Sequence, residues 1–172
     1  MEKGYVHLYT GDGKGKTTAA FGLVLRAAGH GLTSYVGQFM KGQRYGEVEA
    51  LAENPLVTVE QYGDPVCFRR EEVTAAHVAM AEKGLERAAG AMRSGRYDLV
   101  VLDELNVALW FGLLKTDAVL ALLADKPESL EMVLTGRRAP EELVAAADLV
   151  TEMREMRHYY TQGVLARDGI ER

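Results

Sequence analysis

The chain has 172 residues, of which 48% are hydrophobic and 26% are charged, and its formal net charge is −5 at pH 7. This composition is typical of a soluble globular protein, and the length fits a single domain, 1–172. The negative charge argues against broad, nonspecific binding to nucleic acid, which needs a basic face. The single cysteine, Cys67, excludes an internal disulfide. The four histidines lack ligand spacing, so we expect no transition-metal site built by the protein.

No apolar run reaches the ~18 residues that a membrane-spanning helix needs. The first ten residues, MEKGYVHLYT, lack the apolar stretch of a secretory signal. We therefore expect a cytoplasmic protein with no membrane segment.

A loop rich in glycine and lysine lies within residues 5–18, YVHLYTGDGKGKTT. A β-branched and aromatic run precedes it and the apolar segment AAFGLVLRAA follows, which is the strand and helix context of a phosphate-binding loop. Glycines let backbone N–H groups point inward, lysines add positive charge, and a hydroxyl at the helix start can reach a magnesium ion. The residues that fit these roles are Gly11, Gly13, Gly15, Lys14, Lys16, and Thr17 or Thr18.

The spacing of this loop is close to the general nucleotide-binding pattern but irregular. Thr10 stands where the first glycine of that pattern belongs, and Gly11 comes one residue late. The alternative interpretation is a solvated Gly-Lys turn between a strand and a helix.

Further elements follow from hydrophobic periodicity and from turn residues. We expect strands at 33–39, 57–62, 98–104, 129–134 and 148–153, and helical segments at 18–28, 46–54, 71–93, 116–124 and from Pro140 onward. Strands and helices alternate, which implies parallel pairing with right-handed crossovers. The fold class is α/β, one doubly wound domain with a mostly parallel sheet and helices on both faces.

Several polar residues fall at the carboxyl edge of the predicted sheet, where open α/β sheets bind ligands. Asp103 and Glu104 end one strand, where they can hold magnesium directly or through water, unless they form a surface acidic turn. Arg137 is a reasonable phosphate ligand at the same edge. After the second strand, residues 41–44 include Lys41, Gln43 and Arg44, which either contact a phosphate or substrate or form a solvated loop.

The only tryptophan, Trp110, is followed by Phe111 in the segment NVALWFGLL. Such an aromatic pair serves packing, a subunit contact or a ligand wall. An exposed apolar pair of this kind motivates the hypothesis of a homodimer.

Four segments together, GDGKGKTTAAFG, VVLDELNVAL, VLTGRRAPEELVAAADLVTEM and RHYYTQGVLARDGIE, resemble the ATP:corrinoid adenosyltransferases of the CobA/BtuR/CobO type. The resemblance runs from residue 5 to residue 171. It implies a RecA-like P-loop nucleotide-binding fold. It also implies transfer of the 5′-deoxyadenosyl group of ATP to a reduced Co(I) corrinoid, with release of triphosphate, in adenosylcobalamin synthesis or salvage. Mg²⁺ and an electron donor such as a reduced flavoprotein are further implications.

The resemblance assigns roles to individual residues. Residues Asp12 to Thr17 would contact the phosphates, in an orientation reversed from ordinary P-loop enzymes. Thr17 and Glu104, with Asp103 beside them, would lie around magnesium, and Arg137 would help to bind ATP. Lys16, Thr17 and Glu104 would form the catalytic set.

The chain departs from better-known members of that family in two places. It has no extended arm before the first strand, and it carries Cys67, Phe68 and Arg69 where those members carry a Phe-x-Trp pair. Phe68 is the candidate for displacing the axial ligand of cobalt in the corrinoid pocket, and the alternative is a core phenylalanine.

Two other functions are open from the sequence. A phosphotransferase or ATPase on the same fold would use a carboxylate such as Asp103 to orient water or a hydroxyl. A regulatory module would bind ATP without catalysing a reaction.

Overall fold

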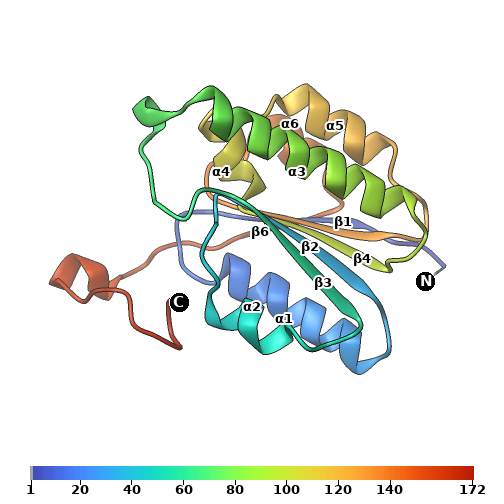
Figure 1. Ribbon diagram of the computed structural model, residues 1–172, viewed down its shortest axis with the longest axis horizontal. Coiled ribbons are helices and arrows are strands. Elements are labelled where there is room, and N and C mark those ends of the chain that lie inside the picture. Colours follow the sequence, from blue (N-terminus) through green and yellow to red (C-terminus); the bar gives the residue numbers. More distant parts are fainter. Residues whose placement is uncertain (1) are drawn as a thin grey trace.

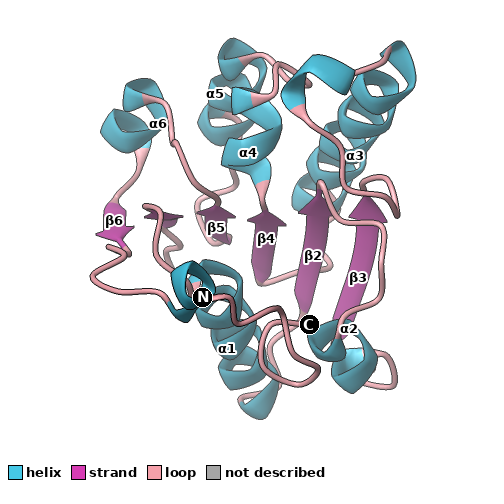
Figure 2. Ribbon diagram, turned by 90° about the vertical axis from the view of Figure 1, so that its left-hand side faces the viewer, coloured by secondary structure: helices cyan, strands magenta, loops and turns pink. Residues whose placement is uncertain are grey.

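The computed structural model describes residues 2–172 as one α/β unit around a parallel sheet. Within these residues six strands pair in the order β3-β2-β4-β5-β1-β6, and every pairing is parallel. In Figure 2 the arrows of β2, β3 and β4 point the same way. The strands are β1 Val6–Thr10, β2 Ser34–Phe39, β3 Val57–Tyr62, β4 Leu99–Asp103, β5 Glu131–Thr135 and β6 Leu149–Glu152.

Helices cover both faces of the sheet (Figure 1). On one face are α1 Lys16–Gly29 and α2 Gly46–Leu51. On the other are α3 Ala75–Arg93, α4 Leu105–Trp110, α5 Thr116–Ala124 and α6 Glu141–Ala146. Two short 3-10 turns span Arg70–Glu72 and Tyr159–Gln162. Among residues 2–172, no helix has both the length and the apolar character needed to cross a membrane.

The α/β prediction is confirmed, and the sheet is wholly rather than mostly parallel. The prediction of a helix from residue 71 is wrong in its first turn, because Arg70–Glu72 forms a 3-10 turn and α3 begins at Ala75. Thr74 caps α3, since its hydroxyl accepts a hydrogen bond from the backbone N–H of His77 at 3.4 Å. Helix α1 begins at Lys16, two residues before the predicted start.

Strands β1 to β5 contribute side chains to two hydrophobic cores, because successive side chains point to opposite faces, whereas the residues of β6 are exposed. In β4, Val100 and Leu102 belong to the core under α3, whereas Leu99 and Val101 belong to the core under α1. The same alternation puts Asp103, the last residue of β4, on the α1 side. The alternation of side chains along β4 therefore determines that the carboxylate of Asp103 can contact α1 and not α3.

The strand order explains how α1 reaches β4. The chain leaves β1 through the glycine loop, and α1 crosses beneath β5 and β4 before β2 begins. Because β5 and β4 lie between β1 and β2, the first turn of α1 comes under the carboxyl ends of both strands. The loop and the acidic end of β4 meet although about 85 residues separate them in the sequence.

Helix α3 packs closely on the sheet at Gly84. A methyl group at Gly84 would lie 2.7 Å from Cγ of Tyr62 and 3.0 Å from Cε1 of Phe39. Gly90, two turns further along the same helix, is exposed and has no heavy atom within 4 Å of such a methyl.

We predict opposite effects of alanine at these two glycines. Gly84→Ala should lower the free energy of unfolding by about 1–3 kcal/mol, because the added methyl overpacks the buried ring of Tyr62. Gly90→Ala should raise it by about 0.5–1 kcal/mol, because alanine loses less backbone entropy in a helix. Urea unfolding of both variants measures the difference. Equal changes would contradict the close packing at Gly84.

Candidate functional site

A cavity of about 720 Å³ opens at the carboxyl edge of the sheet. Its wall combines the glycine loop and first turns of α1, the segment between β2 and α2, and Glu104 and Arg137 after β4 and β5. The last residues of the chain, 169–172, complete the wall. His158 also lines the cavity, so six separate segments of sequence meet around one space.

The glycine loop holds a lysine ammonium inside its own curve. Lys16 is 6% exposed, and its Nζ donates to the carbonyl oxygens of Gly11 and Gly13, both at 2.7 Å. Burial lowers the pKa of Lys16. Gly11 needs the absence of a side chain, because its φ is +92° and a methyl there would lie 2.4 Å from the carbonyl oxygen of Met153.

Beneath the cavity lies the buried carboxylate of Asp103, which has no exposed surface. Its Oδ1 accepts from Thr17 Oγ1 at 2.9 Å and from Thr135 Oγ1 at 2.7 Å. Its Oδ2 accepts from Lys41 Nζ at 2.9 Å and from Gln38 Nε2 at 3.1 Å. Asp103 thus joins α1, β2, β5 and the segment after β2.

The adjacent carboxylate, Glu104, has a different environment. Its backbone is left-handed, with φ of 58°, so the chain turns as it leaves β4, and Glu104 lines the cavity. Among the described residues its carboxylate forms no ion pair or hydrogen bond. Burial, and then the charge of Asp103, raise the pKa of Glu104. Of the two carboxylates, only that of Glu104 lines the cavity.

The structure brings most of the predicted site residues together. The cavity wall contains Gly13, Lys14, Gly15, Lys16, Thr17, Thr18, Glu104 and Arg137. Gly11 and Asp12 belong to the loop but not to the wall, and Asp103 lies below it.

Phe68 lies elsewhere, outside the wall of this cavity. Its ring stacks on His77, with centroids 4.0 Å apart and 9° between planes, and meets Phe111 edge-on at 5.7 Å. Phe68 is partly buried against the core under α3. The structure thus gives this ring a packing role, and no observed contact tests the predicted role toward cobalt.

The aromatic pair Trp110 and Phe111 does not form an uncovered apolar surface. Trp110 is 39% exposed, but the guanidinium carbons of Arg138 and Arg70 lie 4.5 and 5.6 Å from its ring centroid. Such cation–π contacts keep the ring partly covered. Phe111 is only partly buried against the core and meets Trp110 edge-on.

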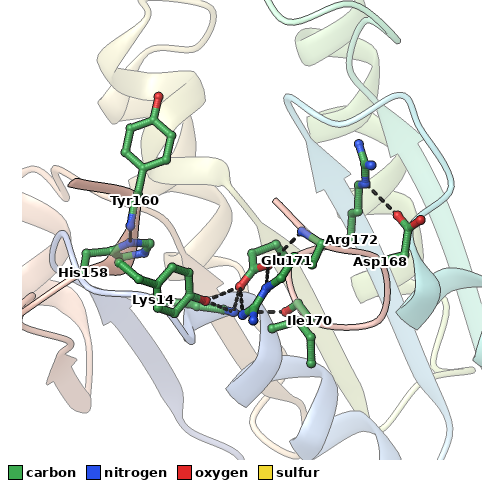
Figure 3. A network of polar contacts seen from close by, with 9 residues as sticks. Lys14, His158, Tyr160, Asp168, Ile170, Glu171 and Arg172 are labelled. Atoms are coloured by element: carbon green, nitrogen blue, oxygen red, sulfur yellow. Dashed lines mark hydrogen bonds and ion pairs between the residues drawn. The ribbon is translucent and has the colours of Figure 1, made fainter. Parts of the chain in front are cut away.

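The C-terminal segment folds back over the glycine loop. Figure 1 shows it extending beyond the sheet and returning toward α1, and Figure 3 shows the polar contacts that hold it. Lys14 Nζ donates to Glu171 Oε1 at 2.6 Å, to the carbonyl oxygen of Ile170 at 3.1 Å and to Tyr159 Oη at 3.1 Å. Arg167 also pairs with Glu171, at 3.3 Å. Lys14 therefore fastens the tail, whereas Lys16 lies within the loop.

Sequence reasoning did not assign residues 169–172 or Tyr45 to the wall, and it left Lys41 open. The structure resolves the segment after β2: Lys41 reaches Asp103, while Gln43 donates to the carbonyl of Pro65 and Arg44 pairs with Glu49 at the surface. No local pattern distinguishes these three polar residues, since only the contacts between distant loops select Lys41.

The wholly parallel sheet, the glycine loop between β1 and α1, and the carboxylates at the end of β4 define an α/β protein with its ligand site at the carboxyl edge. The sequence model of the family described as "ATP:corrinoid adenosyltransferase BtuR/CobO/CobP" matches residues 2–172. The chain belongs to this family.

Individual relatives agree with that assignment. The protein is 39% identical to a "Corrinoid adenosyltransferase" of Sinorhizobium sp, over 99% of this chain and 81% of the relative. It is 37% identical to a "Corrinoid adenosyltransferase" of Pseudomonas aeruginosa, over 99% and 84%. It is 35% identical to "Corrinoid adenosyltransferase CobA" of Salmonella typhimurium, over 99% and 86%. The likeness thus covers the loop, the acidic strand end and the tail.

We predict that the charge of Glu171 holds the tail in place. Glu171→Gln should speed amide hydrogen exchange in residues 167–172 by about two- to fivefold, because it removes the partner of Lys14 and Arg167. Asp168→Asn is the matched control, since Asp168 pairs only with Arg172 in the same segment. Equal exchange rates in the two variants would show that the Lys14 contact does not hold the tail.

Proposed function

We propose that this protein transfers the 5′-deoxyadenosyl group of ATP to the cobalt of a reduced Co(I) corrinoid and releases triphosphate. The observation that carries the proposal is the family match over residues 2–172, which spans every segment of the cavity wall. The relatives named above are corrinoid adenosyltransferases, so the same chemistry in adenosylcobalamin synthesis or salvage is the natural assignment for this chain.

The proposed reaction needs no general base from the protein. The electron pair of Co(I) forms the bond to the ribose C5′, while the bond between C5′ and the α-phosphate oxygen breaks and its electrons leave with triphosphate. Cobalt is thereby oxidised formally from Co(I) to Co(III). The protein must hold ATP, exclude water and stabilise negative charge on the departing triphosphate.

Residues of the cavity wall suit these tasks. Lys16, inside the glycine loop, and Arg137, after β5, offer positive charge from two sides of the cavity. Fixed charges of this kind act strongly where water is excluded, because they need no reorganisation during the reaction. We propose that the loop residues Gly11 to Thr18 bind the phosphates of ATP through these charges and through backbone N–H groups.

Mg²⁺ fits this site through oxygen donors. Among residues 2–172 there is no cluster of three or more His, Cys, Asp or Glu side chains that could hold a metal. Mg²⁺ does not need one, because it is usually bound by one or two carboxylates together with substrate phosphates and waters. Thr17 and Glu104 would hold the ion, with Asp103 behind Thr17. When bound, the ion would neutralise phosphate charge.

The hydrogen bonds of Asp103 bear on the alternative function of an ATPase or phosphotransferase. An ATPase or phosphotransferase would need a carboxylate free to orient water or a hydroxyl. Asp103, the candidate for that role, is fully buried and already accepts four hydrogen bonds. This saturation argues against Asp103 as the residue that would orient water or a hydroxyl for cleavage at the γ-phosphate.

The proposal extends to partners. A reduced flavoprotein would supply the electrons that reduce cobalt to Co(I). The enzyme would work in the cytoplasm as a homodimer. The partly exposed side chain of Trp110 is the observation that suggests the dimer. Phe68 stays the candidate for displacing the axial ligand of cobalt. The net charge of −5 supports the absence of a nucleic-acid partner.

We predict that the two loop lysines differ in their effect on ATP binding. Lys16→Ala should weaken ATP binding by about 100-fold or more, because it removes a charge held at the centre of the loop. Lys14→Ala should have a smaller effect, since Lys14 is engaged by Glu171. Calorimetric titration with ATP measures both. A folded Lys16→Ala protein with unchanged affinity would refute the phosphate-loop interpretation.

The products of the reaction test the function itself. Under anaerobic, reducing conditions with a Co(I) corrinoid and ATP, we expect one intact triphosphate per corrinoid alkylated and a light-sensitive cobalt–carbon product. Ion chromatography of the phosphates and the corrinoid absorption spectrum measure these two yields. ADP with orthophosphate would indicate an ATPase or kinase instead, and unchanged ATP would indicate a binding module.

A further inference from the structure

One lysine that the proposed reaction has not used lies at the centre of the site. Lys41, two residues past the end of β2, lines the cavity, and its side chain is only 15% exposed. Its Nζ is 2.9 Å from Asp103 Oδ2 and 3.2 Å from Thr17 Oγ1. The ammonium thus lies between the first turn of α1 and the end of β4.

The backbone around Lys41 is shaped to bring it there. Met40, the residue before it, has a left-handed backbone with φ of 59°, which is rare for a side chain of this size. The loops after β2 and β3 cross in contact: a methyl at Gly63 would lie 2.1 Å from the backbone nitrogen of Lys41, and one at Gly42 would lie 2.4 Å from the carbonyl oxygen of Gly63. Backbone strain of this kind clusters at functional sites.

The charge of Lys41 is well maintained despite its burial. Its Nζ lies 2.9 Å from Asp103 Oδ2 and 3.8 Å from Glu47 Oε1. A lysine side chain is an ammonium at neutral pH unless its burial is uncompensated, and these carboxylates compensate it. Among the described residues only two acceptors lie within hydrogen-bond distance of Nζ, since Glu47 is 3.8 Å away. An ammonium has three protons, so one is left for a ligand in the cavity.

The position of this charge is unusual for a phosphate loop. In P-loop enzymes the loop hydroxyl and a strand-end carboxylate usually share a magnesium ion. Here the corresponding pair, Thr17 and Asp103, shares the ammonium of Lys41. A fixed cation from the protein thus contacts the same loop hydroxyl, that of Thr17, which would hold Mg²⁺ together with Glu104.

We propose that Lys41 is a polyphosphate-binding residue that supplies a metal-independent positive charge to the site. Its ammonium binds the triphosphate of ATP and stabilises the triphosphate as it leaves, and its hold on Asp103 leaves Glu104 as the carboxylate available to Mg²⁺. This inference rests on the proposed function, since it takes the polyphosphate of ATP as the ligand.

A purely structural role for Lys41 makes a different prediction. A buried carboxylate that loses its cation is destabilising, so Lys41→Met alone can weaken binding simply by disturbing the fold. Asp103→Asn removes the buried charge that would require neutralisation. Comparing Asp103→Asn with the double variant Lys41→Met/Asp103→Asn therefore isolates what Lys41 does for the ligand.

The test is calorimetric titration with inorganic tripolyphosphate in the presence of a chelator, followed by titration with ATP, on proteins checked for folding by circular dichroism. We expect Lys41→Met to weaken tripolyphosphate binding by about 10- to 100-fold in both backgrounds, as expected for loss of a charge-assisted contact. Lys115→Met, at an exposed lysine that precedes α5 and lies outside the cavity wall, is the matched control and should bind like the wild type.

The outcomes separate this inference from the proposed function. Equal tripolyphosphate affinity of Asp103→Asn and the double variant would overturn the inference alone, because Lys41 would then only neutralise Asp103. A wild-type protein that binds neither tripolyphosphate nor ATP would overturn both the inference and the proposed function.

Discussion

The site depends on one buried charge, the carboxylate of Asp103. A carboxylate without exposed surface is costly unless hydrogen bonds and an opposite charge compensate it. Four side chains do so, Thr17, Gln38, Lys41 and Thr135, and they come from three separate parts of the chain. Loss of one partner of a buried ion pair typically costs about 3–5 kcal/mol. The glycine loop, the segment after β2 and the strand ends are therefore positioned relative to one another by a single side chain.

This arrangement separates two neighbouring carboxylates into different roles. Asp103 follows the alternation of β4 and points under the cavity, where its hydrogen-bonding capacity is used by the protein. The left-handed backbone of Glu104 then turns the chain out of the strand and leaves its carboxylate at the cavity wall. Two adjacent acids thus become a structural anchor and a ligand-facing group.

The same division applies to the lysines of the site. Lys16 is held by carbonyl groups within the loop, Lys41 by Asp103, and Lys14 by the C-terminal segment. All three lysines line the same cavity, but each one hydrogen-bonds to a different neighbour. A count of lysines near the glycine loop therefore says little about which of them would bind a ligand, because each ammonium already hydrogen-bonds to its own protein partner.

The sequence by itself determined the α/β class, the position of the strands, the glycine loop and the acidic end of β4, because hydrophobic periodicity and loop glycines are local signals. The family resemblance extended this to a proposed reaction. Only the tertiary structure decided that Lys14 pairs with Glu171, that Phe68 stacks on His77, and that Lys41 rather than Arg44 enters the site. These outcomes depend on contacts between segments far apart in the chain, and no local pattern encodes which distant partner a polar side chain will find.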